Sequence, residues 1–160
     1  MGAVLTEDMK RIIDEQRLGF VATVDPDGTP NLSPKATFSV IDDHSIGYCE
    51  IRSPRTMSNI ARGSAIEVNF VDPFVRKGYR FKGKAEVTTR GGARFGELVE
   101  HFSKHGSIIE RVRAVVVIRV DRALPLISPA YDGGLTEESE VRRLWTKRLR
   151  ELQPGSRFTE

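Results

Sequence analysis

Apolar side chains first recur at helical spacing and then gather into short runs typical of strands. The helical set lies behind Thr6, a residue type that caps helix N-termini, and it consists of Leu5, Met9, Ile12 and Ile13. It predicts a short amphipathic helix that ends near Arg17. The segments that follow have other periods, so the chain leaves helical patterning early.

Six segments have the continuous or alternating apolar pattern of β-strands. They are residues 18–24, 30–40, 46–51, 65–71, 79–89 and 114–120. The turn sequence Asp25-Pro26-Asp27-Gly28 joins the first two, which predicts a hairpin. The last segment is the most apolar and is rich in β-branched residues, so we expect it in the core.

Three further helices are predicted between and after the strands. One follows Ser53 over about residues 54–62, and one covers about residues 95–102 and ends before Gly106. The third, about residues 136–152, has an apolar stripe opposite a basic one. Strands joined mostly by hairpins, with helices as inserts, predict a mainly β protein: a six-stranded antiparallel barrel with peripheral helices.

Length and composition favour a single domain over residues 1–160. The chain has 39% hydrophobic residues, enough to bury a core. No apolar run approaches the roughly 20 residues that span a bilayer, and the first residues lack the basic and apolar regions of a secretory signal, so we expect a cytoplasmic protein. The single Cys49 excludes an internal disulfide and a Cys-cluster zinc site, and in a strand it is expected to be buried.

Charge and motif searches exclude several functions and leave anion binding open. The 25 basic and 22 acidic residues are interspersed, and the net charge of +3 permits an anionic ligand without requiring one. His101 and His105 share a helical spacing, but Phe102 stands where a zinc protease has its glutamate, so no metal site is predicted. The chain has no Walker loop, no dinucleotide-binding glycine motif and no hydrolase nucleophile elbow.

The segment 53–60 has the local chemistry of a phosphate site. Ser53 suits the N-cap and Pro54 the first helical position, directly after the strand expected over residues 46–51. The free N–H groups of such a helix start attract an anion, and Arg55 adds a forked donor with a full charge. An ordinary capped helix with a solvated arginine gives the same pattern.

Three motifs in this order resemble one known family. They are Gly19-Phe20-Val21-Ala22-Thr23-Val24-Asp25-Pro26-Asp27-Gly28-Thr29-Pro30-Asn31-Leu32-Ser33-Pro34-Lys35, the turn from Ser53 to Ile60, and Tyr79-Arg80-Phe81-Lys82-Gly83-Lys84-Ala85-Glu86-Val87. Together they resemble the pyridoxamine 5′-phosphate oxidase-like FMN-binding split β-barrel family over roughly residues 5–124. The resemblance implies a homodimer that holds FMN in a cleft between its subunits, and a flavin-dependent oxidoreductase whose substrate is unassigned.

Carried over residue by residue, the resemblance implies a set of flavin contacts. The phosphate would be bound by Ser53 and Arg55, with help from Thr56 and Asn59. The flavin would be faced by Ser33, Pro34, Lys35 and Thr37, with Lys35 at either the phosphate or the polar edge of the ring. Glu50 and Ile51 would lie along the isoalloxazine ring. Many members have a second basic residue where Pro54 stands, so the resemblance implies either a lower phosphate affinity here or compensation by Lys35, Lys82 or Lys84.

Other functions remain open from the sequence alone. The family also contains members that use a deazaflavin or bind haem, and a protein that stores or senses flavin without turnover fits the same residues. A third class is a barrel that binds single-stranded nucleic acid, since residues 76–82 interleave basic and aromatic side chains. The dispersed acidic residues disfavour nucleic acid as a partner.

Overall fold

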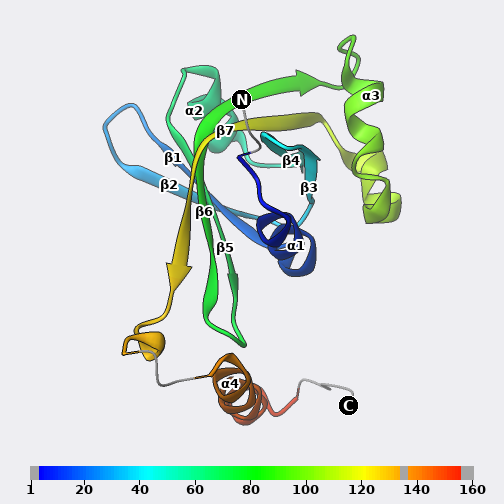
Figure 1. Ribbon diagram of the computed structural model, residues 1–160. Coiled ribbons are helices and arrows are strands. Elements are labelled where there is room, and N and C mark those ends of the chain that lie inside the picture. The colour runs from blue at the N-terminus through cyan, green and yellow to red at the C-terminus, as the bar shows by residue number, and fades with distance from the viewer. Residues whose placement is uncertain (1–3, 134–136, 156–160) are drawn as a thin grey trace.

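The protein is described here by a computed structural model of residues 4–133 and 137–155. Figure 1 shows a strongly curved sheet with helices around it. The elements are α1 (Glu7–Gln16), β1 (Gly19–Val24), β2 (Pro30–Lys35), β3 (Phe38–Asp42), β4 (Ser45–Glu50), α2 (Pro54–Ala61), β5 (Ile66–Asp72), β6 (Lys77–Thr89), α3 (Phe95–Glu100), the 3-10 helix η1 (Ser103–Arg111), β7 (Ala114–Ile127), the 3-10 turn η2 (Pro129–Tyr131) and α4 (Glu138–Leu152). The prediction of a mainly β fold with peripheral helices is confirmed.

The described strands form one antiparallel sheet in the order β2-β1-β5-β6-β7-β4-β3. The segment 30–40, predicted as one strand, is two strands on opposite edges of this sheet, so the sheet has seven strands and not six. The chain leaves β2 at Ala36, and the hydroxyl of Thr37 then exchanges hydrogen bonds with the backbone of Cys49 in β4, at 3.0 and 3.1 Å. This switch of partners places β2 and β3 at opposite edges of one open sheet.

The main core fills the concave side of the sheet. Phe38 and Phe70 meet edge to face with ring centroids 4.8 Å apart, and α1 closes the space with Ile12 and Ile13, both buried. A Cβ on Gly19 would lie 2.6 Å from the Phe38 ring, so this position needs a glycine. The helix predicted from the spacing at the N-terminus is present, with Thr6 as its N-cap.

A second apolar cluster lies on the other side of β4 and β7, under α3 and η1. It contains Cys49, Leu98, Phe102, Val112 and Val115. Cys49 is buried as predicted, and burial raises the pKa of its thiol to about 12. The helix predicted over about residues 95–102 is shorter, because α3 ends at Glu100 and the chain continues as the 3-10 helix η1, in which Gly106 has a φ of 63°.

His105 gives this cluster a predicted pH dependence. Its Nε2 lies 3.0 Å from the carbonyl oxygen of Phe38, and partial burial lowers the pKa of the imidazole, as does the neighbouring Lys104. A lowered folded-state pKa contributes stability above the unfolded value of about 6.5, and this stability is lost as the pH falls through the folded pKa. We expect the urea concentration at the unfolding midpoint to decrease as the pH is lowered from about 7.5 to about 5, and to decrease less in His105→Asn. An unchanged pH dependence in that variant, with His101→Asn as control, would contradict this role.

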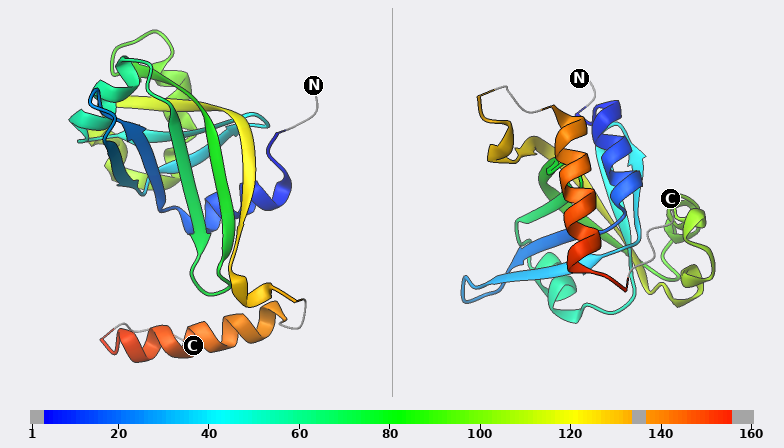
Figure 2. Two further views of the ribbon diagram at one scale, coloured as in Figure 1. Left: turned by 90° about the vertical axis from the view of Figure 1, so that its left-hand side faces the viewer. Right: turned by 90° about the horizontal axis from the view of Figure 1, so that it is seen from below.

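Helix α4 lies across the tip of the β5–β6 hairpin, at the far end of the molecule from α2 (Figures 1 and 2). Val141 is buried there, the guanidinium of Arg76 lies 4.1 Å from the ring centroid of Trp145, and Lys77 pairs with Glu138 at 3.0 Å. Its predicted start, residue 136, lies outside the described residues. Within residues 4–133 and 137–155, no helix is long and apolar enough to cross a membrane.

Candidate functional site

The start of α2 has the predicted residues in an unexpected arrangement. Ser53 occupies the N-cap position and Pro54 the first helical position, but the Ser53 hydroxyl makes no capping hydrogen bond to the helix. It donates instead to Oε2 of Glu50, and the Ser53 N–H donates to Oε1 of the same carboxylate. The first turn of α2 therefore receives no cap from the side chain that was predicted to supply one.

A buried ion pair joins the ends of two strands beside this helix start. Lys35 ends β2 and Glu50 ends β4, and the Lys35 Nζ lies 3.0 Å from Oε2 of Glu50 while it also donates to the Ser53 hydroxyl. The two side chains are only 9% and 4% exposed. The ammonium lies 5.4 Å from the ring centroid of Tyr48, whose hydroxyl has a pKa raised by burial and then by the charge of Glu50.

Arg55 is the most accessible of the predicted phosphate ligands. Its side chain is 73% exposed, and its guanidinium is 3.5 Å from a carboxylate oxygen of Asp25 in the β1–β2 turn. A surface ion pair of this kind is weak, so the guanidinium can turn to a ligand at little cost.

Thr56 and Asn59 face the β1–β2 hairpin, whose turn also carries Asp25, the partner of Arg55. Asn59 donates to Thr23 Oγ1 at 3.0 Å and to Asp25 Oδ1 at 2.7 Å, and Thr56 accepts from Asn31 Nδ2 at 3.1 Å. Both side chains are buried. These bonds attach α2 to the sheet. The two residues would therefore affect a bound phosphate by positioning the helix and not by contacting the phosphate.

A surface depression of about 730 Å³ adjoins the helix start and includes several predicted residues. Lys35, Thr37 and Ile51 line it, whereas Ser33, half-buried in β2, is not part of its lining. The complete lining is Pro34, Lys35, Ala36, Thr37, Cys49, Ile51, Arg52, Ile108, Arg111 and Arg113. The lining thus has four basic residues and no acidic one.

Three of these basic residues, Arg52, Arg111 and Arg113, were missed by sequence reasoning. None of their side chains makes an ion pair with any residue that the structure describes. Arg52 follows β4 and Arg113 precedes β7, and the antiparallel register pairs Glu50 with Ala114 and so brings these two strand ends together. Basic residues directly outside two apolar strands were the available signal, but the sequence does not state which strands are neighbours.

The segment that carries Arg111 and Arg113 is held in place by Arg90. Its guanidinium donates to the carbonyl oxygens of Val112 at 2.7 Å and of Ile109 and Glu110 at 3.0 Å each. Its charged group also lies 5.3 Å from the ring centroid of Phe95. Three hydrogen bonds from one rigid group fix the backbone here, so contacts within the chain organise this wall of the depression.

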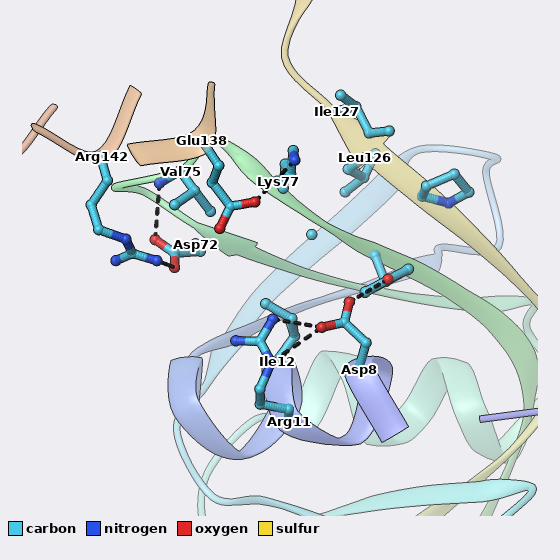
Figure 3. Close-up of a pocket in the computed structure, with 13 residues that line it drawn as sticks. Asp8, Arg11, Ile12, Asp72, Val75, Lys77, Leu126, Ile127, Glu138 and Arg142 are labelled. Atoms are coloured by element: carbon cyan, nitrogen blue, oxygen red, sulfur yellow. Dashed lines mark hydrogen bonds and ion pairs between the residues drawn. The ribbon is translucent and has the colours of Figure 1, made fainter. Parts of the chain in front are cut away.

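A second pocket, of about 290 Å³, lies between α1, the β5–β6 hairpin, the end of β7 and α4 (Figure 3). Its charges are already paired: Asp8 with Arg11, Lys77 with Glu138, and Asp72 with Arg142. The hydrogen bonds from Tyr79 and Arg11 lower the pKa of the Asp8 carboxyl. None of the predicted flavin contacts lines this pocket, which belongs to the opposite end of the molecule from α2.

The interleaved segment 76–82 does not present its aromatic residues on an open face. Phe81 is fully buried, the hydroxyl of Tyr79 donates to Asp8 at 2.5 Å, and Arg80 and Lys82 both pair with Glu67. A single strand could not stack on these rings. The hypothesis of a nucleic-acid surface therefore loses the support of this segment.

Comparison with known proteins identifies the family. HupZ of Group A Streptococcus is 38% identical, with 78% of this chain and 95% of that chain covered and a TM-score of 0.67. An FMN-binding protein from Syntrophomonas wolfei (14% identity, 74% and 84% covered, TM-score 0.62) and an F420 reductase (19% identity, 75% and 98% covered, TM-score 0.55) share the fold. No curated protein matches. The sequence model described as pyridoxamine 5′-phosphate oxidase matches residues 5–125, and the chain belongs to that family.

Proposed function

We propose that the protein binds FMN, with the phosphate at the start of α2 and the ring system in the adjoining depression. The observation that carries this proposal is the depression without acidic residues, where Arg52, Arg111 and Arg113 have no ion-pair partner among the described residues. Its volume of about 730 Å³ lies within the roughly 300–1,000 Å³ of ordinary cofactor pockets. When bound, FMN would supply hydride or electron transfer.

The residues present fit such a ligand in two parts. Arg55 and the N–H groups at the start of α2 suit a phosphate because all of them are hydrogen-bond donors. Arg55 adds a full positive charge, and the N–H groups lie at the positive end of the helix dipole. Pro34, Ile51 and Ile108 offer apolar contact to a ring, and the arginines would place positive charge beside it. A positive charge near the ring stabilises its reduced, anionic form.

Parallel titrations with three cofactors test this assignment. We expect FMN to bind more tightly than a deazaflavin or haem, because its terminal phosphate would bring a doubly charged anion to the start of α2. Tighter binding of the deazaflavin or of haem would transfer the proposal to that cofactor. FMN that binds but is reduced by no nicotinamide donor would favour storage or sensing of flavin over an oxidoreductase.

We also propose a homodimer with the flavin at its interface. Phe20 and Val24 in β1 and Leu32 in β2 are 43%, 44% and 63% exposed, and the register that pairs Ala22 with Leu32 places them on the same outer face. A cluster of exposed apolar side chains is typical of an interaction surface.

Substitution of Leu32 tests the dimer. Leu32→Glu places an unpaired charge in the proposed interface. We therefore expect the dissociation constant of the dimer to increase at least about tenfold and the affinity for FMN to fall with it. Analytical ultracentrifugation with Thr89→Glu as control measures the first effect. A dimer unaffected by Leu32→Glu would remove the β1–β2 face from the interface.

A further inference from the structure

The carboxylate of Glu50 is held by donors of the kind that bind a phosphate. Its Oε1 accepts from the Ser53 N–H, and its Oε2 accepts from the Ser53 hydroxyl and from the Lys35 ammonium. A backbone N–H at a helix start, a hydroxyl and an ammonium are together the donor set of an oxyanion site. In this structure an oxyanion of the chain itself accepts from all three.

The same contacts change the electrostatics of the helix start. Glu50 is 4% exposed and neutralises Lys35, so this lysine, although it lines the cationic depression, adds little net charge there. The Ser53 hydroxyl is directed toward Glu50 and not toward α2. A phosphate at the start of α2 would meet a buried negative charge and would have to share or displace the donors that this charge holds.

We propose that Glu50 acts as an internal competitor for the flavin phosphate and thereby sets how strongly the site prefers a phosphorylated flavin to riboflavin. This inference rests on the proposed function. Arg55 and the first-turn N–H groups then supply the attraction for the phosphate, while Glu50 opposes it. The ring, which carries no phosphate charge, is bound independently of this balance.

The substitution Glu50→Gln tests the competition because it keeps the shape and an acceptor oxygen but removes the charge. We expect FMN affinity to rise at least about tenfold, since Lys35 becomes available to the phosphate, and riboflavin affinity to stay within about twofold. Without ligand, the variant is less stable than the native protein because Lys35 has lost its counter-charge. Saturating FMN should raise the melting temperature of the variant by more than it raises that of the native protein. Glu67→Gln, which removes another ion-paired carboxylate, is the matched control and changes neither affinity.

Two results would overturn the inference. Equal changes in FMN and riboflavin affinity would mean that Glu50 is only structural, and weaker FMN binding in Glu50→Gln would mean that the carboxylate organises the site for the phosphate. If Glu50→Gln does not fold, Glu50→Ser removes the same charge and leaves room for a phosphate, and the same comparison applies.

A titration with inorganic phosphate separates this inference from the proposed function. If neither flavin binds the native protein, the proposed function fails. Tighter phosphate binding by Glu50→Gln than by the native protein would then still show that Glu50 competes with an oxyanion at the start of α2. Equal phosphate binding by the two proteins would refute it.

Discussion

Lys35→Met is expected to reduce the free energy of unfolding by about 3–5 kcal/mol, the usual cost of removing one partner of a buried ion pair. The variant keeps the aliphatic volume but leaves the Glu50 carboxylate, 4% exposed, without its cation. The hydrogen bonds from Ser53 remain, and they do not compensate a full buried charge. Urea unfolding of the protein without ligand, near neutral pH, measures the effect.

Two comparisons isolate the buried charge as the cause. Lys82→Met breaks the pair with Glu67, whose side chains are 40% and 25% exposed, and we expect it to cost no more than about 1 kcal/mol. The double variant Lys35→Met/Glu50→Leu removes both charges and should recover much of the lost stability. A loss in Lys35→Met no larger than in Lys82→Met would contradict the buried pair.

Arg55→Ala is expected to weaken FMN binding at least about tenfold, because a hydrogen bond to a charged group contributes about 1.5–3 kcal/mol. The stability of the protein without ligand should hardly change, because the side chain is 73% exposed and its pair with Asp25 is long. Fluorescence titration of FMN measures the affinity, and thermal unfolding without ligand measures the stability.

Riboflavin and Arg62 provide the controls for Arg55. Riboflavin lacks the phosphate, so Arg55→Ala should leave its affinity within about twofold. Arg62 stands at the opposite end of α2, where it donates to Ser58 and Asn59, and Arg62→Ala should leave FMN binding almost unchanged. An Arg55→Ala variant with native FMN affinity would remove Arg55 from the site.

The sequence predicted most of the fold because its patterns are local. Each of two patterns predicts one element by itself. The spacing of Ile12 and Ile13 behind Thr6 predicts α1, and the β-branched run predicts β7 and its burial. The break at Ala36 was missed, because β2 and β3 follow each other with only Ala36 and Thr37 between them, and it is their different partner strands that separate them. Partner choice over a long sequence distance is not visible in a local pattern.

Local patterns also predicted the part of the candidate site that lies within one segment, but not the part that several strands build together. The helix start at Ser53, Pro54 and Arg55 is a local motif, and the structure has a helix there. The contacts of Ser53 with Glu50 and Lys35 depend on two other strands, and the clustering of Arg52 with Arg113 depends on the register of β4 and β7. A sequence names such residues but does not place their side chains together.

A crystal structure of the protein grown with saturating FMN tests the central proposal most directly. We predict the phosphate at the start of α2 within hydrogen-bond distance of Arg55, and the ring against Pro34, Ile51 and Ile108. A phosphate bound by Arg111 and Arg113 would contradict this orientation of the cofactor. FMN in the pocket between α1 and α4, or a protein that binds no FMN at saturation, would contradict the proposed site itself.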